Sequence, residues 1–142
     1  MDTCRYNVSG ERMSLYKKLR ELRIMLIDDD EWIRDSLSFH FHGEGCHLDT
    51  YESAEEGITA LKEKGYDIII ADYFLPGMDG LKFFTRIHKS HERIIKILIT
   101  AYGSDDVILA AQQLGIHALI KKPFTTTSLE GSLSQLLDND IK

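Results

Sequence analysis

Short apolar runs recur along the chain, and each has the length of a strand. The clearest lie at residues 24–27, 68–71 and 94–99, with a weaker one at 116–120. They are rich in isoleucine and show no polar alternation, which is typical of strands buried on both faces of a parallel sheet. A further short strand is predicted at 47–51, so the sequence predicts five strands.

Between these runs the apolar positions recur at intervals of three or four residues, which predicts a helix after each strand. Ser53 with Glu56, and Thr127 with Glu130, have the spacing of capping boxes, and Ser104 is placed to cap another helix. Five strands alternating with five helices predict an α/β fold with a doubly wound parallel sheet. The positions expected to face inward are Ile33, Leu37, Phe41, Ala54, Ile58, Leu61, Leu81, Phe84, Ile87, Val107, Ala110, Ala111, Leu114, Leu129, Leu133, Leu136 and Leu137.

The chain divides into an N-terminal extension at 1–21, one domain at 22–138 and a short tail at 139–142. The extension is predicted to be partly helical from about Ser14, because Leu15, Leu19 and Leu22 share one helical face. Two interpretations of the extension stay open. It either packs on the domain or serves as an arm that docks a partner or a second copy.

Composition and charge narrow the class of protein. The chain has 142 residues and a formal net charge of −6, but the first 23 residues are net basic and the rest is strongly acidic. An acidic body argues against nucleic-acid binding by the domain itself. No apolar stretch reaches the ~20 residues of a membrane helix, and no signal peptide is recognisable, so we expect no membrane association. Cys4 and Cys46 lack metal-site spacing and are expected to be free thiols in a cytoplasmic protein.

Polar groups follow the apolar runs where each predicted strand ends. The first run leads into Asp28-Asp29-Asp30, the third into Thr100, and the central run ends at Asp72. The last run ends in Lys121-Lys122 before Pro123. Because parallel strands bring their carboxyl ends to one edge of the sheet, we expect these groups to converge there. Carboxylates, a hydroxyl and an ammonium suit a divalent metal and a phosphoryl group. His40, His42 and His47 also lie near one another in sequence, but solvated or core histidines are the simpler interpretation.

These segments, read in order as IDDDEWIR, DYFLPGMDG, ILITA and KKPF, resemble the receiver domain of bacterial two-component response regulators. The resemblance covers about residues 22–138 and is closest to stand-alone, chemotaxis-regulator-like members. It implies a flavodoxin-like fold with strand order 2-1-3-4-5. It also implies a phosphorylatable signalling switch rather than an enzyme acting on an external substrate.

The resemblance further implies the roles of individual residues. Asp72 would be the phosphoacceptor, and Mg²⁺ would be held by Asp28, Asp29, Asp72 and the main-chain carbonyl of Phe74. Lys122 would pair with Asp72 and then with the phosphoryl oxygens, through a Lys-Pro bond that is commonly cis in the family. Lys121, one residue earlier, is expected on the opposite face of the strand as surface charge.

Switching in the family depends on positions that this chain fills in part. Thr100 would donate its hydroxyl to a phosphoryl oxygen, and the small Ala101 leaves access to the donor. The position usually held by a rotating Tyr or Phe is Leu119, so the common aromatic form of the switch is in doubt. Phe74 and Tyr102 stand at the two positions that border the path of the hydrolytic water, and their large rings predict slow self-dephosphorylation.

The resemblance implies a sensor histidine kinase or phosphotransfer protein as donor and a downstream protein as target. The receiver would be a monomer or a phosphorylation-dependent dimer. Three alternatives stay open: the receiver portion of a larger DNA-binding regulator, a pseudo-receiver that only binds, and a haloacid-dehalogenase-like phosphohydrolase. The last would use Asp28 in an Asp28-x-Asp30 motif, although Trp32 stands where that motif expects Thr or Val.

Overall fold

Five parallel strands form one sheet in the order β2-β1-β3-β4-β5, as predicted. The computed structural model describes the backbone of residues 2–101 and 103–141 and the side chains of residues 10–101 and 103–138. Isoleucine-rich β3 occupies the centre and is buried at every position. The strands are β1 (Arg23–Ile27), β2 (His47–Tyr51), β3 (Ile68–Asp72), β4 (Ile95–Thr100) and β5 (Ala118–Lys121).

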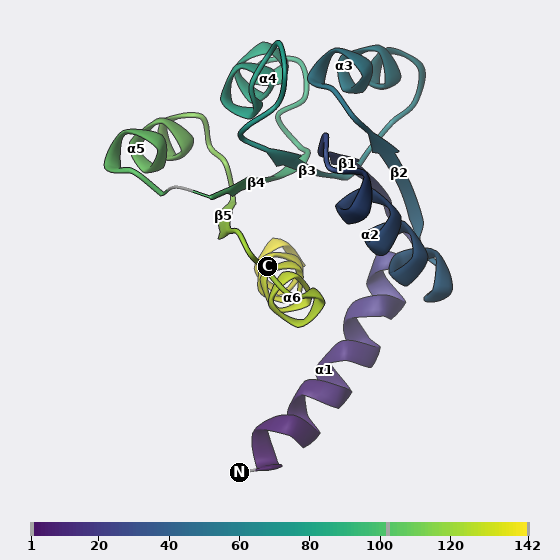
Figure 1. Cartoon of the computed structure of the whole chain (residues 1–142). Helices are drawn as coiled ribbons and strands as arrows, with labels where there is room; N and C mark the ends of the chain where they lie inside the picture. Colours follow the sequence, from purple (N-terminus) through teal and green to yellow (C-terminus); the bar gives the residue numbers. More distant parts are fainter. Residues whose placement is uncertain (1, 102, 142) are drawn as a thin grey trace.

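Helices cover both faces of the sheet (Figure 1). They are α1 (Asp2–Leu19), α2 (Glu31–Gly43), α3 (Ala54–Glu63), α4 (Gly80–Ile87), α5 (Asp105–Gln113) and α6 (Thr126–Ile141). One buried cluster joins α1, α2 and α6 to the sheet, and a second cluster lies beneath α3, α4 and α5. Five helices therefore alternate with the strands as predicted, and the N-terminal extension adds a sixth to the described part of the chain.

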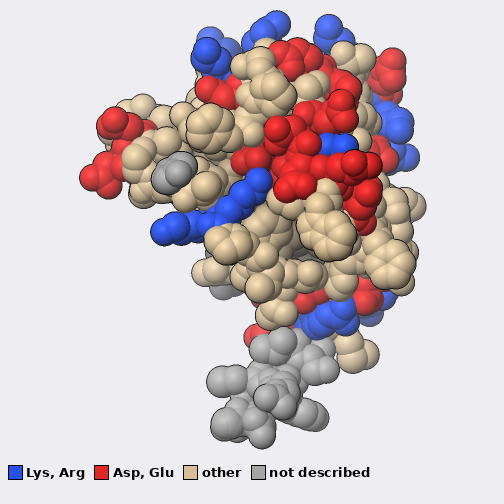
Figure 2. Space-filling model, viewed as in Figure 1, with Lys and Arg blue, Asp and Glu red and all other residues tan. Residues whose placement is uncertain are grey.

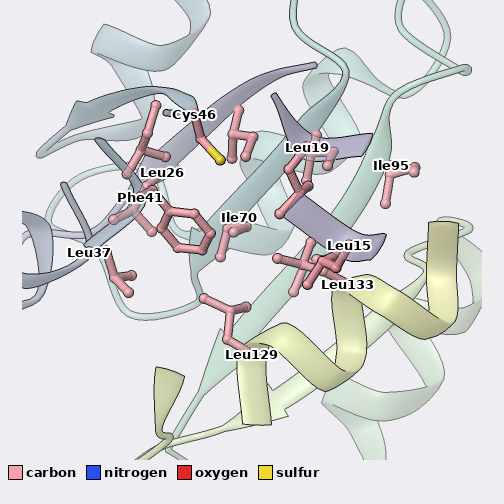
Figure 3. Close-up of a cluster of buried hydrophobic side chains, with 14 of the residues drawn as sticks. Leu15, Leu19, Leu26, Leu37, Phe41, Cys46, Ile70, Ile95, Leu129 and Leu133 are labelled. Atoms are coloured by element: carbon pink, nitrogen blue, oxygen red, sulfur yellow. The ribbon is translucent and has the colours of Figure 1, made fainter. Parts of the chain in front are cut away.

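Helix α1 packs on the domain through its second half. Leu15, Tyr16 and Leu19 are almost completely buried, and they join a cluster that includes Leu133 of α6 and Phe41 of α2 (Figure 3). The helix begins at Asp2, earlier than the predicted start near Ser14. The apolar spacing that predicted this helix is confined to its last turns, so its first turns left no signal in the sequence.

Two of the three predicted helix caps, Ser53 and Ser104, are confirmed. Ser53 accepts a hydrogen bond from Glu56 N at 3.2 Å, and Ser104 accepts one from Val107 N at 3.3 Å. The predicted capping box of Thr127 and Glu130 is wrong. Helix α6 begins two residues earlier than that box requires, because Thr125 and Ser128 exchange side-chain to backbone hydrogen bonds at 3.0 Å.

Glu130 does not cap α6 and is instead the centre of a polar cluster beneath α1. Its Oε2 accepts a hydrogen bond from Tyr16 Oη at 2.5 Å and lies 3.1 Å from His40 Nε2 and 3.2 Å from Arg12 Nε. Burial first, and the neighbouring Glu130 second, raise the pKa of Tyr16, so the phenol stays protonated and donates. The cluster ties α1 to both α2 and α6, which supports the interpretation that the extension packs on the domain.

Among the helices of the described chain, none is long and apolar enough to cross a membrane.

Candidate functional site

The predicted site residues meet at the carboxyl edge of the sheet. The register pairs Asp72 of β3 with Ile99 of β4, and Thr100 of β4 with Lys121 of β5. The next residue, Lys122, returns to the sheet by donating its backbone N–H to Thr100 O at 2.9 Å. Figure 2 shows acidic side chains gathered in the middle of this face, around the ends of the central strands. The order of strands thus brings together groups that lie far apart in the sequence.

Three carboxylates form the acidic centre of this edge. One oxygen each from Asp28, Asp29 and Asp72 lies within 4.8 Å of the others. Asp28 is fully buried and Asp72 nearly so, whereas Asp29 is exposed. The carboxylate of Asp30 instead caps α2 by accepting a hydrogen bond from Trp32 N at 2.9 Å. The three carboxylates predicted to hold Mg²⁺, those of Asp28, Asp29 and Asp72, therefore lie together in the described residues.

The residues present fit a hard divalent cation. Asp28 Oδ1 accepts a hydrogen bond from Asp30 N at 2.9 Å, but Asp28 Oδ2 is buried and makes no hydrogen bond among the described residues. Burial chiefly, with a further contribution from the charge of Asp72, raises the pKa of Asp28 above its ordinary value. A cation bound to these oxygens would remove both costs, and carboxylate oxygens are the ligands that Mg²⁺ selects.

Lys122 supplies the positive charge opposite the acids. Its Nζ donates to Asp72 Oδ2 at 2.8 Å and lies 3.3 Å from Asp28 Oδ2. Burial disfavours the ammonium, but the hydrogen bond to Asp72 and the charges of both acids outweigh it and raise the pKa of Lys122. The bond between Lys122 and Pro123 is cis, as the resemblance implied. Lys121 is exposed, as predicted from strand alternation.

The loop after Asp72 is shaped by two glycines. Gly77 has a φ of +78°, a conformation that side chains other than glycine rarely adopt. At Gly80, an added Cβ would lie 2.5 Å from Asp72 O, so only glycine lets α4 approach the end of β3 this closely. Asp79 then caps α4 by accepting from Lys82 N at 2.8 Å. Gly80 and the Asp79 cap therefore hold the end of the loop close to Asp72.

The predicted switch and access residues differ in their surroundings. Thr100 is 2% exposed at the end of β4, whereas Ala101 is exposed. Leu119 is half-buried and packs against the second core cluster, and Phe74 is 67% exposed beside the acidic centre. The backbone N–H of Phe74 donates to Asp72 Oδ1 at 3.4 Å, while the predicted role of its carbonyl oxygen stays a prediction. Tyr102 lies outside the described residues.

Two residues at this edge were missed by the sequence. Arg34 of α2 donates from Nη1 to Asp28 O at 2.8 Å, and Glu55 of α3 accepts from Met78 N at 3.3 Å. Arg34 thereby links α2 to the residue that follows β1, and Glu55 links α3 to the loop after Asp72. Both are ordinary charged residues in the first turns of amphipathic helices, where surface exposure is the default expectation. Only the contact itself distinguishes them.

Comparison with known proteins gives one family. The sequence model described as "Response regulator receiver domain" matches residues 24–134. The transcriptional regulatory protein GlrR of Escherichia coli is 30% identical over 115 residues, which are 81% of this chain and 26% of that protein. The DNA-binding transcriptional regulator NtrC of Klebsiella pneumoniae is 35% identical over 99 residues, 70% of this chain and 21% of that protein. The chain thus spans about a quarter of the length of these curated relatives.

Solved structures give the same result for the fold. A CheY-like response regulator receiver domain protein from Methanospirillum hungatei has a TM-score of 0.80 and 28% identity. The match covers 84% of this chain and 96% of that chain. The signal receiver domain of an HD domain-containing protein from Pseudomonas fluorescens has a TM-score of 0.77 and 26% identity, covering 84% and 97% of the two chains.

Proposed function

The chain belongs to the response regulator receiver domain family, and on that premise we propose that Asp72 is the residue that accepts the phosphoryl group. One observation carries the proposal. Lys122 Nζ lies 2.8 Å from Asp72 Oδ2, within a group of three carboxylates that lie at the carboxyl edge of the sheet. A nucleophilic carboxylate, a metal-binding set and a fixed cation are the parts that phosphoryl transfer requires.

The transfer step forms one bond and breaks one. A carboxylate oxygen of Asp72 attacks phosphorus, and the bond from phosphorus to the donor's leaving atom breaks, with the electron pair going to the donor. Asp28 and Asp29, with Asp72, would hold Mg²⁺, whose charge offsets the repulsion between the carboxylates and the phosphoryl oxygens. The main-chain carbonyl of Phe74 is proposed to complete the protein ligands.

Lys122 and Thr100 are proposed to report the new charge. Before transfer, the ammonium of Lys122 pairs with Asp72, and after transfer it pairs with the phosphoryl oxygens at the same edge. Thr100, at the end of β4, would donate its hydroxyl to another phosphoryl oxygen and draw the following segment toward the site. Because Leu119 has no ring to bury or expose, the response would pass through the segment after β4 and not through an aromatic swing.

The proposed phosphoryl donor is a sensor histidine kinase or a phosphotransfer protein, and the proposed output is a change in binding to a downstream protein. Relatives such as NtrC are named as DNA-binding regulators, and a larger regulator of this kind is one setting in which this receiver could act. The protein would catalyse only its own phosphorylation and its slow dephosphorylation. We propose residues 22–138 as the functional domain, with residues 1–21 as an extension and 139–142 as a tail.

The test is labelling by a small phosphoryl donor. The full chain is incubated with acetyl phosphate and Mg²⁺, and the intact mass is measured for the wild type, Asp72→Asn and Asp28→Asn. We expect the wild type to gain the mass of one phosphoryl group and Asp72→Asn to gain none. Asp28→Asn would be labelled only slowly, since Asp28 helps to hold the metal. Labelling of Asp72→Asn at the wild-type level would overturn the assignment, and no labelling of the wild type would favour a receiver that only binds.

A further inference from the structure

Arg34, in the helix that follows, forms a hydrogen bond with the loop that carries the proposed metal ligands. Asp28 directly follows β1, Asp29 comes next, and Asp30 caps α2. Arg34 lies one turn into α2, where its backbone N–H donates to Asp30 O at 3.1 Å. Its guanidinium returns to the loop, and Nη1 donates to Asp28 O at 2.8 Å.

The contact to Asp28 O is the strong one of the two that Arg34 makes. The Arg34 side chain is 15% exposed, so its hydrogen bond to a main-chain oxygen is shielded from water and is charge-assisted. Nη2 lies 3.4 Å from Glu52 Oε2, but the Glu52 side chain is 64% exposed, and such ion pairs contribute little. Arg34 therefore acts chiefly on the peptide that joins Asp28 to Asp29.

Fixing that peptide fixes where two ligands point. The peptide unit is planar, so a hydrogen bond that holds the Asp28 carbonyl also sets the direction in which the chain enters Asp29. Two backbone N–H groups of this loop have other partners. Asp28 N donates to Tyr51 O at 3.0 Å, and Asp30 N donates to Asp28 Oδ1 at 2.9 Å. Arg34 supplies the hydrogen bond to the carbonyl oxygen of Asp28.

We propose that Arg34 is a positioning residue for the divalent cation, and this inference rests on the proposed function of the site. It touches neither the cation nor the phosphoryl group. It holds the Asp28–Asp29 peptide in the orientation that lets both carboxylates face Asp72, and it thereby sets the affinity for Mg²⁺. Groups that orient metal ligands in this way are worth about 10–100-fold in metal affinity.

The test compares Arg34→Met, Arg34→Lys and two controls in the full chain. Glu52→Gln removes the exposed ion pair and leaves the bond to Asp28 O, and Arg86→Met removes an exposed arginine from α4, away from the site. Mg²⁺ is titrated while the fluorescence of Trp32, the only tryptophan, is followed, with Asp29→Ala as the variant in which the response should vanish. Thermal unfolding without Mg²⁺ reports the folding of each variant.

We expect Arg34→Met to raise the dissociation constant for Mg²⁺ by about ten-fold or more. Arg34→Lys should recover part of this loss, because an ammonium can still donate to Asp28 O, and Glu52→Gln should change the constant far less. Labelling by acetyl phosphate in Arg34→Met should be slow at limiting Mg²⁺ and approach the wild-type rate at saturating Mg²⁺. A structural role alone would lower the unfolding temperature and leave the Mg²⁺ constant of the folded protein unchanged.

Two outcomes would overturn the inference. One is an unchanged dissociation constant in Arg34→Met, or in Arg34→Lys if the methionine variant does not fold. The other is a labelling rate that is depressed equally at all Mg²⁺ concentrations. Failure of the proposed function would look different, because the wild type itself would then neither respond to Mg²⁺ nor become labelled.

Discussion

Asp28 carries a buried charge that Lys122, 3.3 Å from its Oδ2, offsets only in part. It is fully buried, one of its oxygens makes no hydrogen bond among the described residues, and its pKa is raised chiefly by burial. Asp28→Asn removes this charge at nearly constant shape. We therefore expect the metal-free variant to be more stable than the wild type at neutral pH by about 1 kcal/mol or more, measured by denaturant unfolding.

The same residue predicts how stability depends on pH without Mg²⁺. The unfolded carboxyl has the ordinary pKa of 3.8 and the folded one a higher pKa, so the folded protein binds more protons between the two values. Stability should therefore fall as the pH rises through this window, and Asp28→Asn should lose that slope. If the stabilities of the two proteins stayed parallel across this range, the buried carboxylate would not be the source.

Phe74 is predicted to slow the loss of the phosphoryl group. Its ring is 67% exposed beside the acidic centre, and neither it nor Tyr102 offers a carboxylate or amide to orient an attacking water. The double variant Phe74→Asn/Tyr102→Glu should lose phosphate at least several-fold faster than the wild type after the donor is removed. The measurement is the decay of the phosphorylated mass with time, and equal decay rates would mean that the two rings merely form part of the surface.

Site residues could be predicted from the sequence where a polar side chain follows an apolar strand. Asp28, Asp72 and Thr100 each directly follow an apolar run, whereas Lys122 was preferred to Lys121 through the family resemblance. Arg34 was not predicted, because an arginine in the first turns of a helix is usually solvated, and its bond to Asp28 O depends on how α2 lies against the end of β1. Contacts made by long side chains to main-chain atoms leave no such mark in the sequence.

Helix α1 is held on the domain by buried apolar side chains of its second half. Leu19 is fully buried, Leu15 is 3% exposed and Met13 is 74% exposed. Leu19→Ala should lower the free energy of unfolding by about 2–5 kcal/mol. The control Met13→Ala should change it by less than about 0.5 kcal/mol. Equal effects of the two substitutions would mean that α1 does not pack on the domain in solution.

The polar cluster beneath α1 gives an independent test of the same element. Tyr16→Phe removes the donor to Glu130 Oε2 and leaves a nearly buried carboxylate with His40 and Arg12. We expect a loss of about 1.5–3 kcal/mol in the free energy of unfolding, the usual contribution of a hydrogen bond to a charged group. The double variant with Glu130→Gln should be less than additive, because both substitutions break one contact. Additive losses would show that the contact contributes nothing.

The segment from β4 to β5 is expected to carry the response to phosphorylation. Thr100→Ala should still accept the phosphoryl group, since Asp72 and the proposed metal ligands are unchanged, but the segment should no longer shift. Beryllofluoride mimics an acyl phosphate, so NMR spectra with and without it compare the two states. The wild type should change most around β4, α5 and β5, with little change at Leu119, and Thr100→Ala should change least there. Largest changes on α2 would contradict this route.

Element boundaries were predictable where the apolar period is clean. The strand at 47–51 agrees with the structure and the apolar run at 24–27 lies within β1, whereas β5 begins at Ala118, two residues after the predicted start at 116. The start of α6 was misjudged because Thr125, Thr127 and Ser128 can all cap a helix, and only the hydrogen-bond geometry decides among them. The early start of α1 was hidden because the first turns of that helix carry no apolar repeat.

In the whole molecule, the order of the strands is what brings the site residues together at one edge of the sheet. The alternation of strands and helices was enough to predict two layers of helices around a parallel sheet, and the convergence of strand ends followed from it. The docking of α1 beside α2 and α6 could not be predicted in the same way, because several faces of such a sheet could accept one more amphipathic helix. Its placement depends on Tyr16 and Glu130, which lie 114 positions apart in the sequence.

We propose that Asp72 alone becomes phosphorylated, and chemical location of the acyl phosphate can show this. Borohydride reduces an acyl phosphate to an alcohol, so a phosphorylated aspartate becomes homoserine at its own position in the chain. The full chain is treated with acetyl phosphate and Mg²⁺, reduced and digested, and the peptides are sequenced by mass spectrometry. Homoserine should appear at position 72 and should require Mg²⁺. Homoserine at Asp28 or Asp29 instead would contradict the account.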